Sequence, residues 1–123
     1  MILVYEYLGY RLKLPHSFIS ADIVEKSRVC NGMGPEGFGW MVPDTMYGLD
    51  LSPAGDIHDW MYEYPEGLTK EQCDDTFYEN MKRIIEQDDG WGFTKWLRGR
   101  RAWKYYKAVQ VGGEEHFNGG GSI

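Results

Sequence analysis

A predicted pair of helices in the middle of the sequence constrains the fold more than any other feature. Ser52-Pro53 predicts a helix start, with serine as N-cap and proline at the first helical position, and the helix should run to about Tyr64. Thr69-Lys70-Glu71-Gln72 matches a capping box and predicts a second helix to about Gln87. The linker Pro65 to Leu68 is so short that the two helices are expected to pack antiparallel.

The second helix of this pair also predicts the core, because apolar residues recur along it at helical spacing. These residues are Cys73, Phe77, Met81 and Ile84. A third helix is expected from about Thr94 to Val111, where Gly112-Gly113 ends it.

The remaining segments predict less regular structure. Residues 3–14 alternate polar and apolar side chains toward their end, which favours a short β-hairpin or an extended arm that stops at Pro15. Residues 30–50 contain too much glycine and proline for a helix and are expected to form a loop. The predicted fold is therefore mainly α with a short N-terminal β element, as a single domain over residues 1–113 with a flexible glycine-rich tail at 114–123.

Composition excludes several classes of protein. The chain has 123 residues, of which 42% are hydrophobic and 15% aromatic, enough to bury a core. Two cysteines exclude a disulfide-dense scaffold, and no apolar run is long enough for a transmembrane helix. The N-terminus has no basic region followed by an apolar stretch, so we expect no signal peptide and a cytoplasmic protein at synthesis. Export, or incorporation into a particle, would need a route that the sequence does not show.

Charge is strongly segregated along the chain. The formal net charge is −6, yet residues 1–90 carry 17 acidic and 7 basic groups while residues 91–113 carry six basic groups and no acid. An acidic protein of this kind is a poor general nucleic-acid binder, because phosphate contacts need positive charge.

The basic segment allows two interpretations. Trp96, Trp103 and Tyr106 fall on one side of the expected helix, and this side could complete the core with a solvated cationic back. Alternatively, the cations and flanking aromatics such as Trp91 and Phe93 dock the protein on an anionic membrane surface.

The first helix of the pair carries the residues best suited to chemistry. His58 and Tyr62 share a face, whereas Asp59 points about 100° away, so His58 and Asp59 must have separate roles. A histidine can act as a general base if a carboxylate orients its second ring nitrogen. Asp74 or Asp75 on the antiparallel helix could do so, and Asp74 is favoured because it lies beside the apolar stripe.

The residues beside this histidine also suit a cation site. Asp59 could hold a hard cation such as Ca²⁺, which needs six to eight oxygen ligands. The glycine-rich turn from Cys30 to Pro35 can direct several backbone carbonyls to one point, since glycine permits the required backbone angles.

Three motifs in this order resemble the phospholipase A2 superfamily, most closely the compact forms found in bacteria, phages and prophages. They are Asn31-Gly32-x-Gly34-Pro35, His58-Asp59-x-x-Tyr62 and Cys73-Asp74-x-x-Phe77, and the resemblance covers about residues 30–85. It implies His58 as the general base, Asp74 and Tyr62 as its hydrogen-bonding supports, and a Ca²⁺ ion held by Asp59 and the carbonyls of Cys30, Gly32 and Gly34.

The resemblance implies calcium-dependent hydrolysis of a phospholipid acyl ester, with a phospholipid or membrane surface as the substrate. Water activated by His58 would attack the ester carbonyl, and an N–H of the loop, such as that of Gly32, would help to stabilise the oxyanion. The secreted enzymes carry disulfides that this chain lacks, which agrees with a reducing compartment. Two alternatives remain: a catalytically silent relative serving as a structural or interaction module, as in a phage particle, and an unrelated small binding domain.

Overall fold

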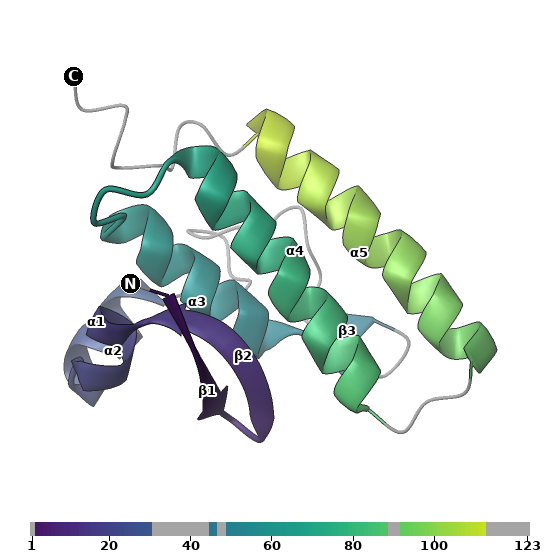
Figure 1. Ribbon diagram of the computed structural model, residues 1–123, viewed down its shortest axis with the longest axis horizontal. Helices are drawn as coiled ribbons and strands as arrows, with labels where there is room; N and C mark the ends of the chain where they lie inside the picture. The colour runs from purple at the N-terminus through teal and green to yellow at the C-terminus, as the bar shows by residue number, and fades with distance from the viewer. Residues whose placement is uncertain (1, 31–44, 47–48, 89–91, 113–123) are drawn as a thin grey trace.

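The computed structural model describes residues 2–30, 45–46, 49–88 and 92–112, and within these ranges the chain is mainly helical (Figure 1). The strands are β1 (Ile2–Tyr7), β2 (Tyr10–Pro15), β3 (Thr45–Met46) and β4 (Leu49–Asp50). The helices are α1 (His16–Ser20), α2 (Ile23–Val29), α3 (Ser52–Glu63), α4 (Lys70–Gln87) and α5 (Gly92–Gly112).

Helices α3 and α4 run antiparallel and side by side, as the short linker predicts (Figure 1). The capping box is present: Thr69 Oγ1 accepts from the N–H of Gln72 at 3.1 Å, and Gln72 Oε1 accepts from the N–H of Thr69 at 2.8 Å. The start of α3 differs from the prediction by one residue. Leu51 occupies the N-cap position, so Ser52 is the first helical residue.

The core lies between β2, α1, α3, α4 and α5, and apolar burial there supplies the main driving force for folding. The predicted stripe on α4 is fully buried, since each of its four members is at most 1% exposed. Of the two interpretations of the basic segment, the one in which Trp96 and Trp103 complete the core is wrong. Arg98, Ala102, Tyr105 and Val109 face the core, whereas Trp96 and Trp103 are exposed.

The N-terminal β-hairpin is confirmed and docks onto α4. Leu8 and Gly9 form its two-residue turn, and both have the positive φ that a type I′ turn requires. The edge of β2 that faces away from β1 is paired by side-chain amides of α4. Asn80 accepts from the N–H and donates to the carbonyl of Lys13, both at 2.7 Å, and Gln87 does the same with Arg11 at 2.9 and 3.0 Å.

Two short helices, α1 and α2, were not predicted. Asp22 caps α2 by accepting from the N–H of Glu25 at 2.8 Å. Within the predicted loop at 30–50, β3 and β4 form a two-residue ladder, while 31–44 and 47–48 lie outside the described residues, as does the predicted tail at 114–123. None of the helices that the structure describes combines the length and apolar character needed to cross a membrane.

Candidate active site

The antiparallel packing of α3 and α4 brings His58 against Asp74. The Nε2 atom of His58 lies 2.9 Å from Oδ1 of Asp74, and both side chains are only 1% exposed. Asp75 takes no part in this contact, because it points outward and accepts a hydrogen bond from the hydroxyl of Tyr106 at 2.5 Å. The structure therefore places beside His58 the carboxylate that the apolar stripe favoured.

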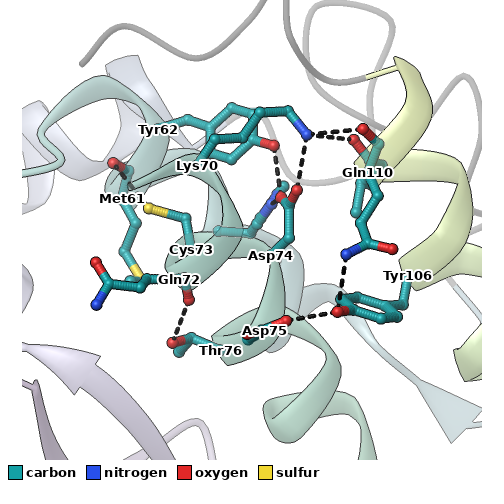
Figure 2. Close-up of polar contacts among 12 residues, drawn as sticks. Met61, Tyr62, Lys70, Gln72, Cys73, Asp74, Asp75, Thr76, Tyr106 and Gln110 are labelled. Atoms are coloured by element: carbon teal, nitrogen blue, oxygen red, sulfur yellow. Dashed lines mark hydrogen bonds and ion pairs between the residues drawn. The ribbon is translucent and has the colours of Figure 1, made fainter. Parts of the chain in front are cut away.

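Asp74 accepts hydrogen bonds from further side chains (Figure 2). The hydroxyl of Tyr62 donates to Oδ1 at 2.5 Å, and the ammonium of Lys70 donates to Oδ2 at 2.8 Å. Such contacts favour the charged form, and although burial raises the pKa of Asp74, its contacts with His58, Lys70 and Tyr62 lower that pKa overall. Asp74 is thus a buried carboxylate that stays ionised.

Lys70 was not among the predicted site residues. Its ammonium also donates to the backbone carbonyls of Val109 at 3.1 Å and Gln110 at 2.9 Å, in the last turn of α5 (Figure 2). Carbonyls at a helix end lack partners within the helix and favour a nearby cation. The i, i+4 spacing of Lys70 and Asp74 was the available sequence signal.

The ring of His58 is held by aromatic side chains as well as by Asp74. Its centroid lies 4.2 Å from that of Tyr62 and 4.5 Å from that of Phe77. Burial lowers the pKa of His58 below its usual value of 6.5, more than the contact with Asp74 raises it. With a neutral ring beside an ionised carboxylate, we assign the proton to Nε2, which donates to Asp74, and the lone pair to Nδ1.

Asp59, the predicted calcium ligand, is 8% exposed and lies near Cys30, where the predicted calcium loop begins. Burial, together with the charges of Asp56 and Asp59, raises the pKa of Cys30 to about 12. The thiol of Cys30 contacts the carbonyl oxygen of Asp56 at 3.2 Å, which fixes the start of this loop against α3.

Gly32 and Gly34 lie outside the described residues, so the structure does not place their carbonyls. Within the described ranges, no cluster of three or more His, Cys, Asp or Glu side chains forms a metal site. One buried carboxylate beside the anchored start of a glycine-rich loop fits a hard cation held mainly by carbonyls. Cys30 and Cys73 are both free thiols.

A cavity of about 500 Å³ opens between the N-terminal hairpin and α2, close to Cys30. It does not reach His58. Its lining residues are Tyr7, Leu8, Ala21, Ile23, Lys26, Ser27, Cys30 and Asp56.

Comparison with models of known protein families, with curated protein sequences and with solved structures finds no match for this chain.

Proposed function

We propose that the protein is a calcium-dependent esterase of the phospholipase A2 type, which hydrolyses a phospholipid acyl ester with water activated by His58. The contact of 2.9 Å between His58 Nε2 and Asp74 Oδ1 carries the proposal. A general base needs a neutral ring held in one orientation by an acceptor on its other nitrogen, and this contact supplies both.

In the proposed reaction, one proton passes from water to His58. Nδ1 of His58 accepts it from water while Nε2 donates to Asp74, and the developing imidazolium is stabilised by the ionised carboxylate. Tyr62 and Lys70 hold that carboxylate in place through its two oxygens. Asp59, with the carbonyls of Cys30, Gly32 and Gly34, would hold the Ca²⁺ ion, which when bound polarises the ester carbonyl.

The experiment that tests this function is the release of fatty acid from mixed phospholipid vesicles, measured with Ca²⁺ and with a chelator. We expect release with Ca²⁺ and none with the chelator. The variant His16→Gln serves as a matched control, because His16 is an exposed histidine at the start of α1 and its loss should leave release unchanged. Absence of release under all conditions would overturn the proposal.

A second candidate is a catalytically silent module of the same type that acts as a structural or interaction protein. The burial of His58, whose side chain is 1% exposed, favours it, since a general base must meet water and substrate. The vesicle assay separates the two candidates, because a silent module would keep the folded helical pair and release no fatty acid.

A further inference from the structure

One side of α5 faces away from the rest of the molecule. The helix packs along α4, on the side remote from α3 and the N-terminal hairpin (Figure 1). Its core side is fixed by Arg98, Ala102, Tyr105 and Val109. Successive side chains are rotated by about 100° around a helix, so another set of side chains lies on the side opposite the core. We call this side the outward face of α5. Its aromatic and basic members are Phe93, Trp96, Arg100, Trp103, Lys104 and Lys107.

The outward face exposes three large aromatic rings. Phe93 is 70% exposed, Trp96 56% and Trp103 50%. Large aromatic side chains gathered at one exposed site indicate a binding surface rather than a packing need. The rings of Phe93 and Trp96 stack with centroids 6.0 Å apart, so they form one continuous apolar strip.

Cations lie directly over these rings. The guanidinium of Arg100 is 5.2 Å from the centroid of Trp96, and the ammonium of Lys107 is 5.3 Å from that of Trp103. Helix α5 contains no acidic residue. Arg98 does not belong to this face, since it is buried and donates to Asp88 at 2.7 Å.

We propose that the outward face of α5 docks on an anionic phospholipid surface. Tryptophan and basic side chains together suit the headgroup level of a bilayer, where the ring is partly buried and the cation meets lipid phosphate. The acidic remainder of the chain does not prevent this, because charges more than a Debye length away, about 10 Å at 0.1 M salt, are largely screened. This docking goes beyond the proposed hydrolysis, since binding to the lipid surface needs no catalytic turnover.

Two other partners fit the face less well. Single-stranded nucleic acid would stack its bases on open aromatic rings, but the rings of Trp96 and Trp103 already carry cations. A second copy of the chain could present its acidic surface, yet it would leave three exposed rings against charged groups. Both partners are outcomes of the experiment below.

The experiment is co-sedimentation with vesicles of phosphatidylglycerol and, separately, of phosphatidylcholine, both in chelator so that no lipid is hydrolysed. We expect tighter binding to phosphatidylglycerol and weaker binding as salt is raised. The triple variant Arg100→Gln, Lys104→Gln, Lys107→Gln should bind phosphatidylglycerol about a hundred-fold less, since each cation near an anionic leaflet contributes about five-fold.

A matched triple variant changes the same charge elsewhere: Arg11→Gln, Lys13→Gln and Lys82→Gln, on β2 and α4. Its binding should stay close to wild type, and circular dichroism should show both triple variants folded. The double variant Trp96→Ala, Trp103→Ala tests the rings, and it should weaken binding while keeping the salt dependence.

Equal binding to both lipids, or an equal loss in the two triple variants, would overturn the docking surface. So would tighter binding of a fluorescent oligothymidylate than of phosphatidylglycerol vesicles, or a dimer in light scattering that the first triple variant abolishes. Docking without fatty-acid release would remove the proposed function and leave this inference standing. Fatty-acid release that does not change in the first triple variant or with anionic lipid would remove the docking inference and leave the proposed function standing.

Discussion

His58 and Asp74 are 16 residues apart in the chain, and their side chains meet at 2.9 Å between two neighbouring helices. Neither side chain reaches bulk water, since each is only 1% exposed. A buried carboxylate is tolerated when donors surround it, and here the imidazole, a phenol and an ammonium do so. This arrangement makes the protonation state of His58 measurable through both activity and stability.

Replacing His58 by glutamine should abolish ester hydrolysis without unfolding the protein. Loss of a general base costs about 100-fold or more in rate, while the amide of glutamine can still donate to Asp74. Fatty-acid release and circular dichroism of the variant check the two halves of this expectation. Activity above about a tenth of wild type would mean that another group activates the water.

Asp59→Asn should remove calcium binding, because Asp59 is the single carboxylate assigned to the ion. Titration calorimetry should give a dissociation constant of about 10⁻⁴–10⁻³ M for the wild type, as for sites with few charged ligands. Asp75→Asn is the control, since that carboxylate is exposed and engaged with Tyr106. Unchanged binding by Asp59→Asn would move the ion to another acidic residue, such as Asp44 or Asp50.

Lys70→Met should destabilise the fold. The change removes the ammonium that donates to Asp74 and to the carbonyls of Val109 and Gln110, so we expect a loss of about 2 kcal/mol in the free energy of unfolding. Urea denaturation measures this loss. Lys82→Met, at an exposed position of the same helix, should stay within about 0.5 kcal/mol of wild type. Similar losses in the two variants would show that Lys70 does not join α4 to α5.

Stability should rise with pH across the titration of His58. Its pKa in the folded protein lies below the 6.5 of the unfolded chain, so the unfolded chain binds more protons and is favoured as the pH falls below about 6.5. Unfolding midpoints in urea, measured from about pH 8 to about pH 5, should decline for the wild type. The decline should be shallower in His58→Gln and unchanged in His16→Gln. Hydrolysis should also rise with pH, but through the lowered pKa of His58 in the folded protein, because only the neutral ring accepts a proton.

The sequence predicts the central helical pair well because the signals are local. A capping box, a four-residue linker and an apolar stripe act within a few residues, and the structure contains all three. The signal for α2 is equally local, since Asp22 and Glu25 have capping spacing. For the same reason Asp74 could be preferred to Asp75 from its place beside the stripe.

Features that depend on distant partners could not be predicted. Large rings suggested that Trp96 and Trp103 face the core, yet Arg98 takes an inner position because Asp88 compensates its charge. Lys70 is matched to carbonyls about 40 residues further along the chain, which no spacing rule can indicate. The catalytic and calcium roles of the site residues stay predictions, since they depend on chemistry that the fold alone does not test.

The amides of Asn80 and Gln87 bear on aggregation. An exposed strand edge is a template onto which another molecule can add a strand. In this protein β1 pairs one edge of β2, and the two amides occupy the outward N–H and carbonyl groups of Lys13 and Arg11 on the other. A third strand could therefore join the N-terminal hairpin only along β1, so half of the usual risk of sheet extension is removed by two side chains of a helix.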